Sequence, residues 1–164
     1  IVNVPYLGDP RGVSLLPGTR EALHRLLDIG AKLFLFTNQS GVGRGYFTMA
    51  EVEKVNRRMT ELLDLGDNVF TAVCIAPERP DEPSRYRKPS PHFIHEMLAV
   101  HAIRAEATWM IGDASSDWEA GINAGVCVAA VNADTADDVA HNRRLQLGVE
   151  AYPSVFDWIN SVLP

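Results

Sequence analysis

The sequence has few of the features that mark disulfide-rich or membrane-spanning proteins. It has two cysteines in 164 residues, Cys74 and Cys127, and both lie in apolar segments that read as strands. Cysteines of this kind are more often buried thiols than a disulfide, which favours the reducing cytoplasm as the location. No apolar run approaches the roughly 20 residues that span a bilayer, so no membrane partner is expected.

Positive charge is also scarce. The chain carries 15 lysines and arginines against 21 acidic residues, with a net charge of −6. This balance disfavours nucleic acid as a partner, because no basic surplus can neutralise phosphates. The length and the hydrophobic share of 46% suit one globular domain with a substantial core. We therefore expect a single domain over residues 1–164, present as a monomer or weak dimer.

Apolar runs alternate with helical patterns along the chain. Strands are expected at 32–36, 69–76, 108–112 and 126–131, and helices at about 19–29, 49–65, 91–101, 118–124, 135–145 and 154–163. Thr48 and Glu51 have the spacing of a capping box, and Ser90 with Pro91 reads as an N-cap followed by the first helical residue. The strands are continuous apolar runs, which is typical of a parallel sheet covered on both faces. The sequence thus predicts an α/β fold, a Rossmann-like three-layer α/β/α sandwich.

Polar residues follow three of these segments. Thr37-Asn38 ends one strand, Gly112-Asp113 ends another, and Arg87-Lys88 ends the loop after a third. In parallel sheets, ligands bind beyond the carboxyl ends of the strands. One site could therefore be built from three separate segments.

The first segment reads TNQSGVGRGYFT, from Thr37 to Thr48. A hydroxyl, amides and exposed backbone N–H groups in a glycine-rich turn suit an anionic oxygen. The alternative is an ordinary turn in which Asn38 and Ser40 bond to their own backbone. Taken alone, the stretch does not decide between them, and it matches neither a Walker loop nor G-x-G-x-x-G.

The second segment, YRKPSP, places Lys88 directly before Pro89. Prolines stiffen the segment and restrict where the ammonium group points, so Lys88 could neutralise a phosphoryl oxygen or a carboxylate. A solvated basic loop is the alternative.

The third segment, WMIGDASSDWEAG, carries Asp113 and Asp117. If a helix starts near Ser115 or Ser116, Asp117 lies in its first turn and points back toward Asp113. Two carboxylates at the carboxyl edge of a sheet suit a hard cation such as Mg²⁺. The alternative is that one of the serines is the N-cap and Asp117 only complements the helix dipole.

Taken in order, these segments resemble the haloacid dehalogenase (HAD) superfamily of phosphatases. More narrowly, they are similar to its subfamily IIIA, the branch of sugar-bisphosphate and histidinol-phosphate phosphatases. The resemblance covers nearly the whole chain, including LLPGTREAL. It implies a Mg²⁺-dependent phosphomonoesterase without a large cap domain. The expected substrate is a small phosphorylated metabolite, first of all a heptose bisphosphate.

The resemblance also implies roles for individual residues. Thr37 would bind the transferring phosphoryl oxygen, and Lys88 would neutralise the phosphoryl group and the nucleophile. Arg87 would contact the rest of the substrate, and Asn38, Gln39 and Ser40 would line the pocket. Asp113 and Asp117 would form the metal site, with Asp117 either on the ion or behind its ligands.

One departure from the family concerns its first motif, Asp-x-Asp-Gly-Thr, which supplies the nucleophile and the general acid-base. The stretch IVNVPYLGDP resembles the segment on the C-terminal side of that motif, so we expect the printed sequence to begin just after it. Asp9 is a poor substitute in its Gly-Asp-Pro turn. The reaction would pass through an aspartyl-phosphate on the preceding strand. The printed chain alone is expected to be inactive, or to be a non-catalytic phosphate-binding module if it is naturally this short.

A second departure concerns zinc. Relatives carry a Cys-x-His and Cys-x-Cys pair in the loop before Arg-Lys-Pro, and the matching positions here are Cys74, Ala76, Ser84 and Tyr86. One possible ligand cannot hold a tetrahedral site, so no structural zinc is expected. The loop carries Arg79, Arg85 and Arg87 instead, which favours a ligand with a second anionic group. The alternative is that Arg79 and Arg85 pair with the neighbouring acids Glu78, Asp81 and Glu82.

Overall fold

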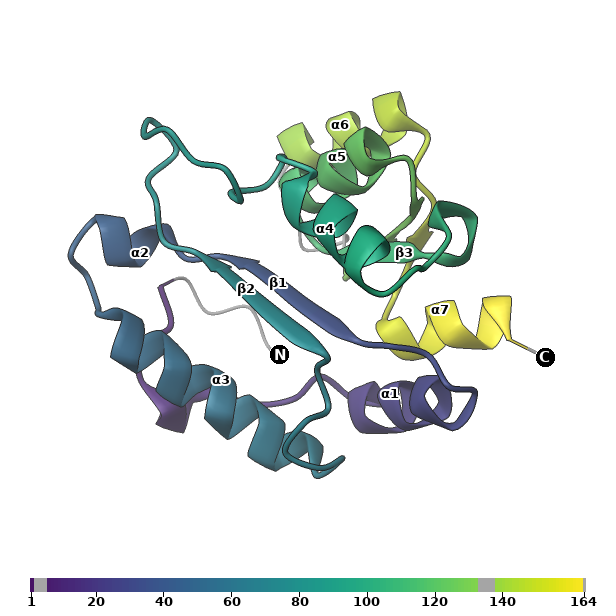
Figure 1. Cartoon of the computed structure of the whole chain (residues 1–164), viewed down its shortest axis with the longest axis horizontal. Coiled ribbons are helices and arrows are strands. Elements are labelled where there is room, and N and C mark those ends of the chain that lie inside the picture. Colours follow the sequence, from purple (N-terminus) through teal and green to yellow (C-terminus); the bar gives the residue numbers. More distant parts are fainter. Residues whose placement is uncertain (2–5, 133–137, 164) are drawn as a thin grey trace. The chain divides into compact units, whose positions relative to one another are not determined.

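The computed structural model describes residues 1, 6–132 and 138–163, and the chain divides into two compact units, 1–87 and 88–164. Each unit is an α/β structure with parallel strands, as the sequence predicts (Figure 1). The prediction of a single domain over the whole chain stays a prediction. Within the part of the chain that the structure describes, none of the helices has the length and apolarity to cross a membrane.

In the first unit, β1 (Phe34–Asn38) pairs in parallel with β2 (Ala72–Ala76), with Thr37 opposite Ile75 (Figure 1). The sequence placed β1 two residues too early, because its limits follow the pairing with β2 and not the apolar run. Thr37 and Asn38 are therefore the last residues of the strand. This register brings the carboxyl ends of both strands, and the loops that follow them, side by side.

Four helical segments accompany this sheet: η1 (Pro10–Gly12), α1 (Thr19–Asp28), α2 (Ser40–Gly43) and α3 (Met49–Leu63). The predicted capping box of α3 is confirmed, since the Thr48 hydroxyl accepts from the Glu51 N–H at 3.3 Å and the Glu51 carboxylate accepts from the Thr48 N–H at 2.7 Å. The inner faces of α1 and α3 bury Ala22, Val52, Val55 and Leu63. The short helix α2 was not predicted.

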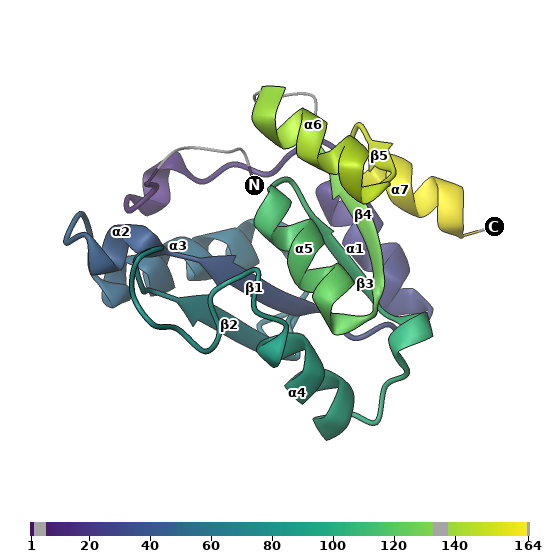
Figure 2. The same ribbon diagram turned by 90° about the horizontal axis from the view of Figure 1, so that it is seen from above.

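The second unit contains a three-stranded parallel sheet in the order β3 (Trp109–Gly112), β4 (Cys127–Val131), β5 (Ala151–Tyr152). Its helical segments are α4 (His92–Val100), η2 (Ala105–Ala107), α5 (Ser115–Ala124), α6 (Asp138–Leu147) and α7 (Val155–Val162). Helix α5 packs on β3 and β4 (Figure 2). Its Trp118 is fully buried in a cluster with Ala130 and Val149, so this helix start is tightly fixed.

Three local expectations need correction or restriction. Pro91, and not Ser90, is the N-cap of α4, although the Ser90 hydroxyl accepts from the His92 N–H at 3.4 Å. Cys74 and Cys127 are free thiols, as expected, but they are half-buried and not buried. The first part of the helix expected at 135–145 lies outside the described residues.

Candidate active site

The turn after β1 holds the first group of candidate residues. Thr37 and Asn38 end the strand, Gln39 follows it, and Ser40 begins α2; all four are half-buried. The Gln39 amide donates to the Thr37 hydroxyl oxygen at 3.0 Å, and the Gln39 backbone N–H donates to the Ala76 carbonyl at 2.7 Å. Because the Thr37 oxygen already accepts a bond, its own hydroxyl hydrogen is left to donate to an anion.

The backbone of this turn contradicts part of the sequence prediction. The N–H groups from Val42 to Tyr46 all donate to backbone carbonyls, so they do not form the expected anion cradle. The turn closes on itself because α2 winds the chain too tightly to leave these groups exposed. What it can offer an anion is the side chains of residues 37–40 and the first N–H groups of α2, which a helix leaves unpaired.

The structure explains why residue 43 of the glycine-rich turn is a glycine. Its N–H donates to the Pro77 carbonyl at 3.0 Å, which ties the turn after β1 to the loop after β2. A Cβ at this position would collide with that carbonyl and crowd the side chain of Arg79. Only glycine allows the two loops to approach this closely.

The loop after β2, residues 77–87, is closed by short-range hydrogen bonds. The Arg79 N–H donates to the Glu82 carboxylate at 2.7 Å, and the Arg79 guanidinium pairs with Asp81 at 2.9 Å. The Ser84 hydroxyl accepts from the Arg87 N–H, and the Arg87 guanidinium donates to the Glu78 carbonyl, both at 2.9 Å. The surface-pair alternative is thus correct for Arg79, whereas Arg87 is held by a neutral acceptor.

In the second unit, Lys88 and Asp117 form a buried ion pair. Lys88 Nζ lies 2.5 Å from Asp117 Oδ1, and only 9% and 7% of the two side chains are exposed. The approach lies off the hydrogen-bonding direction, and Oδ1 has no other partner among the described residues. Lys88 is therefore not the solvated lysine of the alternative interpretation.

The other oxygen of Asp117 is also engaged. Asp117 Oδ2 accepts from the Ala114 N–H at 3.1 Å, which caps the start of α5. The N-cap residue is Ala114, so neither Ser115 nor Ser116 caps the helix. A Cβ on Gly112 would collide with the Asp117 carboxylate, and the Gly112 carbonyl accepts from the Trp118 indole N–H at 2.9 Å. Because Gly112 has no side chain, there is room for the Asp117 carboxylate beside the Lys88 ammonium.

Asp113 is the accessible carboxylate of this group. Partial removal of water by the surrounding protein raises the pKa of Asp113, and the negative charge of Asp117 raises it further. The nearby ammonium of Lys88 lowers it by less, since Lys88 is already paired. Two carboxylates share one ammonium here, and the surplus negative charge suits a hard divalent cation on Asp113. The described residues contain no cluster of three or more metal-binding side chains, so the rest of such a site would come from elsewhere.

Asp9 belongs to a local structural motif. It caps η1, accepting from the Arg11 N–H at 2.9 Å, and pairs with the Arg11 guanidinium at 2.6 Å. The hydrogen bond from the Arg11 side chain holds the pKa of Asp9 below its ordinary value. An exposed carboxylate bound in this way has no feature of a nucleophile, which agrees with the sequence interpretation.

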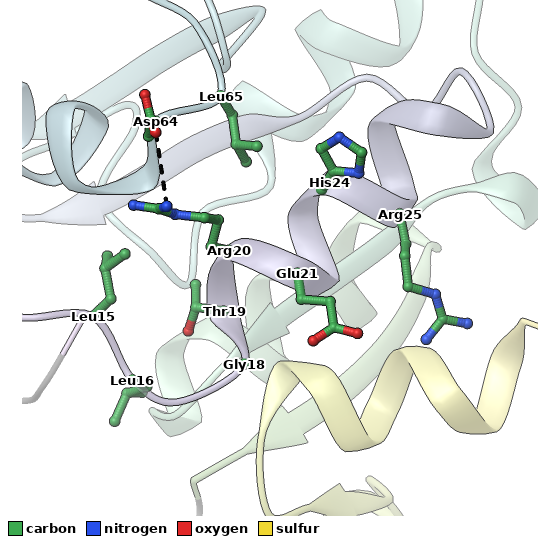
Figure 3. Close-up of a pocket in the computed structure, with 10 residues that line it drawn as sticks. All are labelled: Leu15, Leu16, Gly18, Thr19, Arg20, Glu21, His24, Arg25, Asp64 and Leu65. Atoms are coloured by element: carbon green, nitrogen blue, oxygen red, sulfur yellow. Dashed lines mark ion pairs between the residues drawn. The ribbon is translucent and has the colours of Figure 1, made fainter.

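A pocket of about 480 Å³ lies in the first unit, between α1 and the end of α3 (Figure 3). Arg20 is paired locally: it donates to the Leu62 carbonyl at 2.6 Å and lies 3.7 Å from Asp64, toward which it points in Figure 3. None of the predicted site residues lines this pocket. It is therefore separate from the candidate site.

The structure brings together Thr37 with Gln39 in one unit, and Lys88 with Asp113 and Asp117 in the other. Their assembly into one site stays a prediction. Sequence reasoning did not identify the contacts that Gly112 makes possible or those that Glu78 and Ser84 make with Arg87. The spacing of Ser84 three residues before Arg87 is a turn signal that could have identified one of them.

Known proteins share the fold and part of the sequence of this chain. A profile of the HAD-hydrolase-like family matches residues 85–151, which include Lys88, Asp113 and Asp117. A D,D-heptose 1,7-bisphosphate phosphatase of B. bronchiseptica, solved with magnesium and phosphate, superposes with a TM-score of 0.83 at 23% identity, over 98% of this chain and 90% of that one. This likeness shows that the chain has the HAD-like fold.

Similar sequences include heptose-bisphosphate phosphatases of two bacteria. A D-glycero-β-D-manno-heptose-1,7-bisphosphate 7-phosphatase of Helicobacter pylori is 35% identical over 130 residues, which are 77% of this chain and 75% of that protein. A protein of the same name from Pseudomonas putida is 29% identical over 142 residues, or 87% of this chain and 78% of its own. The chain is a HAD-type phosphatase that resembles the heptose-bisphosphate branch.

Proposed function

We propose that the protein is a Mg²⁺-dependent phosphatase of a sugar bisphosphate, with heptose 1,7-bisphosphate as the first candidate. The observation that carries this proposal is the 35% identity to the Helicobacter pylori phosphatase over 75% of its length. The buried Lys88–Asp117 pair and the Thr37–Gln39 hydrogen bond supply chemistry that suits it.

Thr37 and Lys88 act on the transferring phosphoryl group in this proposal. The Thr37 hydroxyl donates to a phosphoryl oxygen, because Gln39 occupies its acceptor side. The Lys88 ammonium, desolvated beside Asp117, stabilises the negative charge that develops on the phosphoryl oxygens. Asn38, Gln39 and Ser40 line the substrate pocket, and Arg87 binds the distal part of the substrate.

Asp113 holds Mg²⁺ in the proposed site, and the ion supplies Lewis-acid stabilisation of the phosphoryl oxygens. Asp117 is less suited to this role, since its side chain is buried against Lys88 and its Oδ2 atom accepts from the Ala114 N–H. We assign it to positioning Lys88 and capping α5. The proposed reaction needs an attacking carboxylate, which the resemblance to the family assigns to an Asp-x-Asp motif.

The experiment is a panel of phosphorylated metabolites, assayed for released phosphate with the protein that includes the Asp-x-Asp segment. Heptose 1,7-bisphosphate should be hydrolysed with the highest kcat/KM, and Asp113→Asn should abolish its turnover. Equal turnover of a neutral sugar monophosphate would overturn the choice of a bisphosphate. If histidinol phosphate were hydrolysed fastest, it would be the substrate in place of the bisphosphate. Phosphate binding without any hydrolysis would mean a phosphate-ligand module.

A further inference from the structure

Phe47 is a buried aromatic residue in the turn that follows β1. Only 8% of Phe47 is exposed, whereas its neighbour Tyr46 is 61% exposed, so the Phe47 ring points inward. Phe47 directly precedes Thr48, the N-cap of α3, whose capping box is complete. Phe47 and Val52 also have the spacing of a hydrophobic staple, and both are buried. The backbone of Phe47 is therefore held by the start of α3.

The Phe47 ring packs against the backbone of Gly41, the second residue of α2. A Cβ on Gly41 would collide with the far edge of the ring, at the Cε1 and Cζ atoms. The Tyr46 N–H donates to the Gly41 carbonyl at 2.8 Å, so the turn folds back on itself at this point. The position of the first turn of α2 therefore depends on the Phe47 ring.

The near part of the same side chain lies against the N-terminal segment. A Cβ on Gly8 would lie 3.1 Å from Phe47 Cβ and 3.3 Å from the Cγ and Cδ1 atoms. The rings of Tyr6 and Tyr46 form an edge-to-face pair with centroids 4.9 Å apart, which adds an outer contact between the same two stretches. Phe47 thus packs between two glycines that are far apart in the sequence, Gly8 and Gly41.

The residues proposed to meet the phosphoryl group belong to this turn. Thr37 and Asn38 end β1, and Ser40 begins α2. The end of α2 is tied to the loop after β2 by the Gly43 N–H, and its start is set by Phe47. Catalysis tolerates little error in position, since a displacement of about 1 Å can cost ~10²-fold in rate. The packing of Phe47 can therefore control how well these groups are aligned.

We propose that Phe47 is a positioning residue for phosphate binding. Its ring sets the place of Gly41 and Ser40, and so the geometry with which the turn after β1 meets a phosphoryl oxygen. The same side chain keeps segment 6–12 against this turn, and the ring itself touches no ligand. This inference rests on the proposed function and adds the residue that holds its phosphate-binding turn in place.

The test measures the affinity for inorganic phosphate with Mg²⁺ by isothermal titration calorimetry, together with kcat/KM for the sugar bisphosphate. Gly41→Ala should weaken phosphate about tenfold and lower kcat/KM by ~10²-fold, because its methyl group displaces the ring or the turn. Combining Gly41→Ala with Phe47→Leu should bring both values to within about threefold of the wild type. Leucine lacks the Cε1 and Cζ atoms that the methyl group would meet.

Gly8→Ala is the matched control for this rescue. Its methyl group would meet Cβ, Cγ and Cδ1 of Phe47, and leucine keeps all three of these atoms. Phe47→Leu should therefore fail to restore the melting temperature that Gly8→Ala loses. Val55→Ala, in the buried face of α3, is the control for stability. It should lower the melting temperature and leave the phosphate affinity unchanged.

Wild-type phosphate affinity in Gly41→Ala, or a double variant as weak as Gly41→Ala, would overturn the inference. An equal loss of affinity in Val55→Ala would do the same, because it would reflect general loosening. If Gly41→Ala does not fold, Phe47→Leu alone decides: it should bind phosphate about threefold more weakly, and wild-type affinity would overturn the inference. Phosphate binding that follows the expected pattern, without hydrolysis of any metabolite in the panel, would instead overturn the proposed function.

Discussion

Lys88 and Asp117 form an ion pair that is almost fully removed from solvent, with 2.5 Å between the ammonium nitrogen and the nearer carboxylate oxygen. The second carboxylate oxygen caps α5 through the Ala114 N–H. The Lys88 ammonium, which we propose stabilises the phosphoryl group, is thus also the ion-pair partner of the buried Asp117 carboxylate. Activity and stability are linked at this point.

Lys88→Ala should lower kcat/KM by at least ~10²-fold, the range for losing one preorganised electrostatic group. It should also destabilise the protein by about 3–5 kcal/mol, because the buried Asp117 carboxylate is left without a partner. Steady-state kinetics and urea unfolding measure the two effects. Combining Lys88→Met with Asp117→Asn should restore much of the stability and none of the activity. Wild-type turnover in Lys88→Ala would remove Lys88 from the site.

Asp113→Asn and Asp117→Asn should differ in their response to Mg²⁺. The first should raise the Mg²⁺ concentration for half-maximal activity by at least about tenfold, the effect of losing a ligand or its close support. The second should lower kcat, since Lys88 is no longer held, with a much smaller change in the Mg²⁺ requirement. Titration of activity with Mg²⁺ separates them. Equal shifts in both variants would place Asp117 on the metal.

The raised pKa of Asp113 predicts a pH-dependent stability. A carboxyl whose folded pKa lies above its unfolded value is harder to ionise in the folded state, so the metal-free protein loses stability as pH rises through the folded pKa. Metal-free Asp113→Asn should therefore melt at a higher temperature than the wild type at pH 7. The difference should vanish in acid, below the ordinary carboxyl value of 3.8.

Mg²⁺ should reverse that order, since it binds the folded wild type and not the variant. Thermal melts with and without millimolar Mg²⁺ test this, with the exposed Asp67→Asn as a control that should behave like the wild type. A wild type that is indifferent to Mg²⁺ would contradict the assignment of Asp113.

Gly112→Ala should lower both stability and activity. The added methyl group would meet the Asp117 carboxylate, which cannot move because Lys88 and the Ala114 N–H hold it. Overpacking of this kind costs about 1–3 kcal/mol. Gly30→Ala is the control: no atom lies near its added Cβ, and its positive φ of 79° makes it strained but remote from the site residues. It should lose stability and keep full kcat, and a kcat loss equal to that of Gly112→Ala would refute the explanation.

No structural zinc should be bound by the loop 77–87. Ser84, which stands at one of the expected zinc positions, is hydrogen-bonded to the Arg87 N–H, and one cysteine cannot hold a tetrahedral ion. Elemental analysis after refilling metal-free protein with Mg²⁺ and Zn²⁺ in competition checks this. Stoichiometric zinc that survives dialysis against a weak chelator would show the prediction to be wrong.

The sequence predicted the elements that rest on local rules. The capping box at Thr48 is set by neighbouring residues and is confirmed. The parallel pairing of the apolar strands is confirmed as well. The limits of β1 were not predictable, since they depend on pairing with residues far along the chain. The short β5, which consists of Ala151–Tyr152, has too few residues to show any pattern.

For the candidate site, residue types at strand ends were enough to select Lys88, Asp113 and Asp117. They could not show that Asp117 pairs with Lys88 and caps α5, because that depends on a side-chain direction and on the space left by Gly112. The exposed backbone N–H groups considered for the stretch from Thr37 to Thr48 are not found at residues 42–46, for a related reason. Whether an N–H is available depends on whether the turn uses it internally, and the composition of a glycine-rich stretch does not reveal this.

The hydrogen bond from the Gly43 N–H to the Pro77 carbonyl joins two loops that begin at adjacent strand ends. Linked in this way, the loops lose much of their independent motion when the chain folds. Ordering a mobile loop around a ligand reduces affinity, because its conformational entropy is lost at the moment of binding. Here that loss occurs earlier, during folding. Because residue 43 is glycine, the conformational entropy of the loops is lost in the free energy of folding and not in the free energy of ligand binding.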